Sequence, residues 1–126
     1  MPGERVLFVD DEELLTRPAE MLLARMGFDV LVRTQPEQAL LDLEAGGAAF
    51  AALLTDLHMP GLTGLQLIER ARAIHPALPV ALCYGLMDTT ESEAAKALGV
   101  EHFLRKPYTG DELGTTVNAL LAARPG

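Results

Sequence analysis

The sequence predicts an α/β protein built on a parallel β-sheet with helices on both faces. Its 126 residues suit a single domain. Five short apolar runs alternate with five segments of helical periodicity, which is the order expected when helices connect parallel strands. Three of these runs end in charged residues, as is typical of strands whose carboxyl ends form a ligand-binding crevice.

The five apolar runs are each short enough to form one buried strand. Right-handed crossovers between parallel strands place helices on both faces and gather the loops after the strands along one edge of the sheet. The runs are Arg5–Val9, Asp29–Arg33, Ala51–Thr55, Val80–Tyr84 and His102–Arg105.

The first helix is expected between Leu14 and Met26, with Gly27 as its C-terminal stop. Pro18 lies inside this segment and has no backbone N–H group. We therefore expect Pro18 to bend the helix or to leave a loose first turn before it.

The other helices are predicted from capping residues and from glycine or proline stops. Thr34 is expected to cap the second helix, Thr89 or Thr90 the fourth, and Thr109 the fifth. The third helix is expected at about Leu65–Ile74, before a proline.

Composition and charge exclude several classes of function. The formal net charge of −8 argues against direct binding of nucleic acid, which depends on Lys and Arg. Cys83 is the single cysteine, so the chain forms no internal disulfide and no cysteine-based metal site. No apolar stretch could span a bilayer, and Met1–Arg5 does not resemble a signal peptide. We expect a cytoplasmic protein with no membrane insertion.

Three carboxylates and one ammonium are expected to meet at the strand ends. Asp10 and Asp11 follow the first strand, Asp56 the third and Lys106 the fifth. Like charges this close repel unless a cation lies between them. A few oxygen ligands suit Mg²⁺, with Mn²⁺ as a substitute. The acidic pair alone could simply cap the next helix, but Asp56 leads into a loop, where capping explains little.

Three motifs along the chain identify a family. They are the acidic pair within Phe8–Glu12, the D-x-x-M-P-G-x-x-G loop at Asp56–Gly64, and the pair Lys106-Pro107. Over essentially its whole length the chain resembles the receiver domain of two-component signalling systems. The resemblance implies one receiver domain over residues 1–126, with a flavodoxin-like, doubly wound (βα)5 fold and strand order 2-1-3-4-5.

The resemblance also implies a role for each residue of the motifs. Asp56 would be the nucleophile that takes a phosphoryl group from a kinase phosphohistidine. Asp11, Asp56 and the backbone carbonyl of His58 would ligate Mg²⁺ directly, and Asp10 through water. Lys106 would neutralise charge on the phosphoryl group.

The family has further features that we expect here. The peptide bond before Pro107 should be cis. The partner should be a histidine kinase or a histidine phosphotransfer domain, and the chain should be no enzyme beyond its own phosphorylation and dephosphorylation. Family members also form homodimers through the fourth helix, fifth strand and fifth helix. The sequence around Cys83 and Asp56 resembles that of receivers at the carboxyl end of hybrid histidine kinases.

The chain departs from the family at the end of the fourth strand. Receivers carry Thr or Ser there, whose hydroxyl binds the phosphoryl group, but this chain has Tyr84. A phenol oxygen lies far from Cβ and would overshoot that group. Tyr84 could swing outward, cover the site as a lid, or pack against Phe103, which matches the aromatic switch position of the family. Cys83 points to the opposite face by strand alternation and cannot replace the hydroxyl.

These residues are compatible with three functions to different degrees. The first is a phospho-accepting receiver in which the usual coupling of the hydroxyl to the aromatic residue is weakened or altered. The second is a degenerate receiver that acts as a constitutive interaction module, which Tyr84 favours. The third, an aspartyl phosphate-ester hydrolase, would need an acidic residue two positions after the nucleophile, where His58 stands. We rank the receiver first because Asp10, Asp11, Asp56 and Lys106 are all present.

Overall fold

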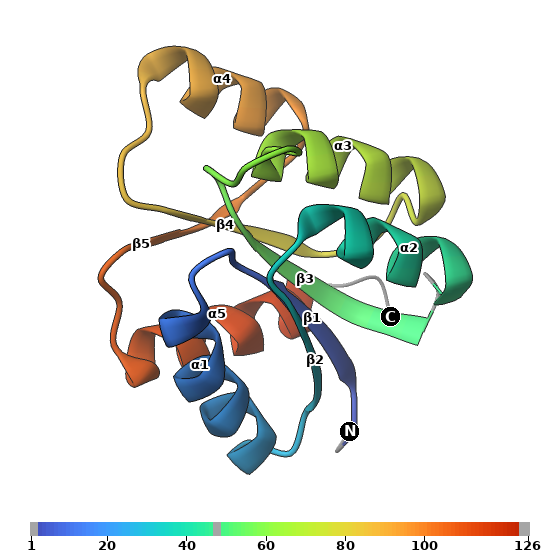
Figure 1. The fold of residues 1–126 in the computed structure, drawn as a ribbon, viewed down its shortest axis with the longest axis vertical. Coiled ribbons are helices and arrows are strands. Elements are labelled where there is room, and N and C mark those ends of the chain that lie inside the picture. The colour runs from blue at the N-terminus through green and yellow to red at the C-terminus, as the bar shows by residue number, and fades with distance from the viewer. Residues whose placement is uncertain (1–2, 47–48, 124–126) are drawn as a thin grey trace.

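The computed structural model describes residues 3–46 and 49–123. Within them, five parallel strands form one sheet in the order β2-β1-β3-β4-β5, with helices packed on both faces (Figure 1). The strands are β1 (Arg5–Val9), β2 (Asp29–Arg33), β3 (Phe50–Asp56), β4 (Val80–Tyr84) and β5 (His102–Arg105). The helices are α1 (Glu13–Arg25), α2 (Pro36–Gly46), α3 (Gly64–Ile74), α4 (Thr89–Ala97) and α5 (Gly110–Ala123).

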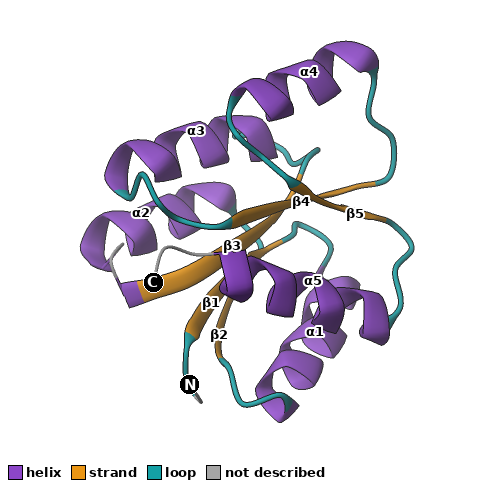
Figure 2. Ribbon diagram, turned by 180° about the vertical axis from the view of Figure 1, so that it is seen from behind, coloured by secondary structure: helices purple, strands orange, loops and turns teal. Residues whose placement is uncertain are grey.

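The sheet is buried on both of its faces. Helices α2, α3 and α4 lie on one side of the sheet, and α1 and α5 lie on the other (Figures 1 and 2). Alternate residues of a strand point to opposite faces of the sheet. Leu7 packs on the face covered by α2 and α3, and Phe8 packs on the face covered by α1 and α5. The predicted fold class and strand order are confirmed.

The strand predictions agree closely with the structure. Four strands have the predicted bounds, and β3 extends one residue further at each end. The extension matters because Asp56 is then the last residue of β3 and is held by the sheet itself. Helix α1 continues through Pro18, so the turn before this proline is helical and not loose.

Two of the predicted helix caps are wrong. Gln35, not Thr34, precedes α2, and its carbonyl accepts the first helical hydrogen bonds. Asp88 caps α4 in a reciprocal arrangement with Glu91, so Thr89 and Thr90 lie inside the first turn of the helix. The cap at the start of α5 is confirmed: the side chains of Thr109 and Glu112 each accept the other's backbone N–H.

Helix α4 lies at the edge of the α2–α3 layer and is sparsely anchored. Its sequence is made of small and polar residues, and Ala95 is its one buried residue. In both views it stands further from the sheet than α2 and α3 do (Figures 1 and 2). Its position therefore depends strongly on the few side chains that reach it. Within residues 3–46 and 49–123, none of the helices has the length and hydropathy needed to cross a bilayer.

Candidate functional site

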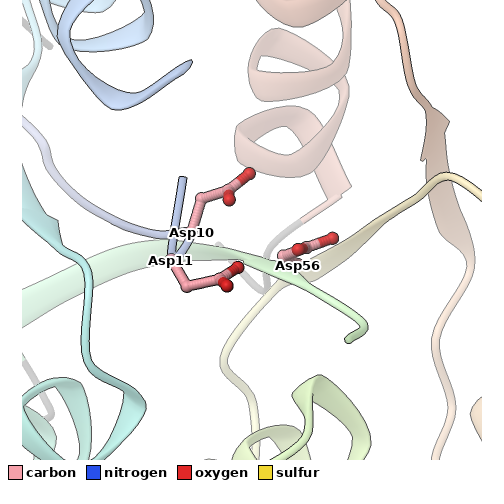
Figure 3. A group of neighbouring side chains, drawn as sticks. All are labelled: Asp10, Asp11 and Asp56. Carbon is pink, nitrogen blue, oxygen red and sulfur yellow. The ribbon is translucent and has the colours of Figure 1, made fainter. Parts of the chain in front are cut away.

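Asp10, Asp11 and Asp56 converge at the carboxyl edge of the sheet, and we call them the acidic cluster (Figure 3). A carboxylate oxygen from each lies within 4.8 Å of the others. The loop after β1 supplies Asp10 and Asp11, and the adjacent end of β3 supplies Asp56. Asp10 and Asp56 are only 1% and 6% exposed, so two of these charges are buried.

Lys106 joins the acidic cluster from the end of β5. Its Nζ lies 2.8 Å from Asp10 Oδ2 and 3.2 Å from Asp56 Oδ2. It also lies 3.2 Å from Glu12 Oε1, an exposed residue that the sequence did not single out. The peptide bond between Lys106 and Pro107 is cis, as the resemblance implied. One ammonium thus contacts three carboxylates.

Backbone amides fix the orientation of the two buried carboxylates. The Glu12 N–H donates to Asp10 Oδ1 at 2.9 Å, and the Leu57 N–H donates to Asp56 Oδ1 at 3.0 Å. In both residues the other oxygen, Oδ2, faces Lys106. The carboxylates are therefore held at both ends before any ligand binds, which preorganises them for chemistry.

The electrostatics of the site shift two pKa values. Burial, and after it the charge of Asp10, raises the pKa of Asp56 to about 6, although Lys106 acts in the opposite direction. Burial disfavours the charged form of Lys106, but Asp10, Asp56 and Glu12 outweigh it and raise the pKa of Lys106 above its usual value. At neutral pH the ammonium is retained and most of Asp56 is ionised.

The acidic cluster fits a hard divalent cation. All of its side-chain ligands are carboxylate oxygens, which Mg²⁺ and Mn²⁺ prefer. Among the described residues, Asp10 Oδ2 is buried and accepts no well-aligned hydrogen bond, and Lys106 Nζ forms an ion pair with it at 2.8 Å. A second cation at the cluster would relieve the remaining repulsion. The part that the His58 carbonyl plays stays a prediction.

Gly64 is the last glycine of the D-x-x-M-P-G-x-x-G loop, and close packing requires a glycine at this position. It is the first residue of α3, and its N–H donates to the Leu57 carbonyl at 2.9 Å. A Cβ on Gly64 would lie 2.2 Å from the Asp56 carbonyl oxygen, which is backbone and cannot move aside. A residue without a side chain lets α3 start directly against the end of β3.

The His58 side chain is turned toward α4. Its Nε2 lies 2.7 Å from Glu91 Oε2, although the ring is more than half exposed. The sequence did not single out Glu91, because the cap of α4 was assigned to Thr89 or Thr90. The one available signal was the spacing from Asp88 to Glu91, which matches a capping box.

Tyr84 and Phe103 pack against the same apolar cluster of the core. Both are half-buried and pack against the apolar cluster beneath α3 and α4. Both rings therefore lie on the same face of the sheet, and the choice among the three arrangements of Tyr84 stays a prediction. Cys83 is buried in the opposite layer, as strand alternation predicted, and burial raises the pKa of its thiol to about 12.

Known proteins share both this sequence pattern and this fold. The family model of the response regulator receiver domain matches residues 6–118. The chain is 32% identical over 116 residues to the sensory transduction protein RegX3 of Mycobacterium tuberculosis, covering 92% of the chain and 50% of RegX3. It is 31% identical over 121 residues to the transcriptional regulatory protein FixJ of Bradyrhizobium diazoefficiens, covering 95% of the chain and 58% of FixJ. The chain thus spans about half the length of these relatives.

Solved structures give the same result. A response regulator receiver protein from Pseudomonas putida matches with a TM-score of 0.85 and 31% identity, over 94% of this chain and 98% of the other. A CheY-like receiver domain protein from Methanospirillum hungatei matches in fold with a TM-score of 0.90 at 22% identity, over 95% and 94% of the two chains. Sequence, fold and the order of the motifs agree, and the chain belongs to the response regulator receiver domain family.

Proposed function

We propose that the protein accepts a phosphoryl group on Asp56 from a phosphohistidine of a histidine kinase or a histidine phosphotransfer domain. The observation that carries this proposal is the meeting of the acidic cluster with Lys106 at one edge of the sheet. Family membership supports a role in two-component signalling.

In the proposed transfer an oxygen of Asp56 attacks phosphorus in line with the bond to the donor imidazole nitrogen. The O–P bond forms, the P–N bond breaks, and the imidazole keeps the electron pair. Lys106 lies against Asp56 Oδ2 and would bind an equatorial phosphoryl oxygen. Asp10, Asp11 and Asp56 would hold Mg²⁺, which supplies the remaining charge neutralisation when bound. The outcome is a modified aspartate, not turnover of a separate substrate.

Incubation with Mg²⁺ and acetyl phosphate tests this proposal. We expect intact-mass measurement to show one added phosphoryl group on the wild-type protein, and none after EDTA treatment. Asp56→Asn should show no adduct, because the amide is a poor nucleophile. A wild-type protein that stays unmodified, or an Asp56→Asn variant that is labelled equally, would contradict the proposal.

Tyr84 stands where other receivers carry Thr or Ser, and this difference leads us to propose an altered response to phosphorylation. Tyr84 and Phe103 pack against the same apolar cluster, and Tyr84 has no hydroxyl on Cβ, so we propose that phosphorylation moves Phe103 less than it does in receivers with Thr at this position. Tyr84→Thr should increase the change in Phe103 amide shift on adding beryllofluoride and Mg²⁺, because a hydroxyl on Cβ can reach the phosphoryl mimic. An equal change in wild type and variant would count against this account.

A degenerate receiver that only binds a partner is the second candidate, and Tyr84 is the observation that favours it. It predicts no adduct under the same conditions, so the mass experiment separates the two. A phosphate-ester hydrolase is disfavoured, because His58 occupies the position of the second acid and is engaged by Glu91. Dimerisation through α4, β5 and α5 stays a prediction.

A further inference from the structure

Side chains from the α3 side hold both ends of α4. At its C-terminal end, Arg72 of α3 donates from Nη1 to the Leu98 carbonyl at 2.6 Å. At its N-terminal end, His58 contacts Glu91 at 2.7 Å. Within α4, Ala95 is the one buried residue, so these two contacts contribute much of what fixes the position of the helix.

Glu91 serves the cap of α4 and the contact with His58 at once. Its Oε1 accepts from the Asp88 N–H at 3.1 Å, while its Oε2 faces His58 Nε2. In return, the Glu91 N–H donates to Asp88 Oδ1 at 2.7 Å. The hydrogen bond from Asp88, followed by that from His58, lowers the pKa of Glu91. A movement of His58 therefore acts on the first turn of α4.

His58 is in turn connected to Asp56 through one residue. The Leu57 N–H donates to Asp56 Oδ1, and it also lies 2.8 Å from the Cys83 carbonyl of β4. Addition of a phosphoryl group to Asp56 changes the charge and the hydrogen-bonding demand on that amide. The route from the modified carboxylate to α4 thus runs through Leu57, His58 and Glu91.

The end of β4 is joined to the site through its backbone alone: the Cys83 carbonyl accepts from the Leu57 N–H at 2.8 Å, and the Tyr84 carbonyl accepts from the Lys106 N–H at 2.7 Å. Tyr84 carries its hydroxyl at the far end of a ring that packs beneath α3 and α4. Gly85, the next residue, has no side chain, and nothing lies within 4 Å of where a Cβ would be. From this contrast we infer that Glu91 is a positioning residue, which couples phosphorylation of Asp56 to the position of α4 through His58. The inference rests on the proposed function.

Amide shifts of the ¹⁵N-labelled protein, with and without Mg²⁺ and beryllofluoride, test this inference. Leu57 reports on the site and residues 89–97 report on α4. We expect both to shift in the wild type. In Glu91→Ala the Leu57 shift should persist, while the α4 shifts fall at least about two-fold.

Asp88→Ala is the matched control. Each variant removes one hydrogen bond of the α4 capping box, but only Glu91→Ala also removes the contact with His58. Asp88→Ala should therefore keep the wild-type response of α4. His58→Ala removes the same contact and leaves both hydrogen bonds of the capping box in place, so it gives the same test if Glu91→Ala frays the helix.

The outcomes separate the inference from the proposed function. A full α4 response in Glu91→Ala and His58→Ala, an equal loss in Asp88→Ala, or a wild-type α4 that never responds overturns the inference alone. Failure of the wild-type Leu57 amide to respond, with no adduct formed, overturns the proposed function and the inference together.

Discussion

Gly64→Ala is expected to reduce the free energy of unfolding by about 3 kcal/mol. The added Cβ would lie 2.2 Å from the Asp56 carbonyl oxygen and 3.0 Å from Leu57 Cα. Both are backbone atoms of the segment that carries Asp56, so α3 must move away from β3 to relieve the overlap. Urea unfolding followed by far-UV circular dichroism measures the loss, and acetyl phosphate labelling should fall with it.

Gly85→Ala provides the control for the same change of residue. Gly85 follows β4 near the site, and a Cβ there would meet nothing within 4 Å. We expect its free energy of unfolding to stay within about 0.5 kcal/mol of wild type. A Gly64→Ala variant that is as stable as Gly85→Ala would show that the loop accommodates the side chain, against our account of this glycine.

Lys106→Met is expected to slow labelling of Asp56 by acetyl phosphate about 100-fold. Methionine keeps the length of the side chain but removes the ammonium that lies against Asp10 and Asp56. Loss of that charge leaves a phosphoryl oxygen without its partner. It also raises the pKa of Asp56 further, since Lys106 acts to lower it, and so reduces the ionised fraction at neutral pH.

Initial rates from intact-mass time courses, measured at several pH values, check both parts of this expectation. The rate of the variant should recover in part toward higher pH, where Asp56 ionises. Lys96→Met is the matched control, because Lys96 is exposed on α4 and is not in contact with the acidic cluster. Equal rates for Lys106→Met and wild type would remove Lys106 from the proposed chemistry.

The fold and the acidic cluster could be predicted because their signals are local. A strand buried on both faces must be apolar along its length, so each strand appears as an apolar run bounded by polar residues. The charged residues that end these runs are brought together by the parallel topology itself. Asp10, Asp56 and Lys106 therefore meet even though up to 96 positions of the 126-residue sequence separate them.

Features that depend on competition between neighbouring side chains could not be predicted in this way. Asp88, Thr89 and Thr90 can all cap a helix, and the choice was decided by Glu91, which lies three residues after Asp88. The contact of Glu12 with Lys106 joins residues whose separation follows no helical or strand period. The orientation of Tyr84 depends on the space left beneath α3 and α4, which no sequence pattern gives.

The position of Lys106 also bears on what the proposed metal ion would do for this protein. Its ammonium is an internal counter-ion that the chain brings to its own buried carboxylates as it folds. Domains built around structural zinc lack such a substitute and unfold when the metal is removed. Under the proposed function we therefore expect folding and metal loading to be separable events. A change in Mg²⁺ concentration should then change how quickly Asp56 is modified, while the amount of folded protein stays nearly constant.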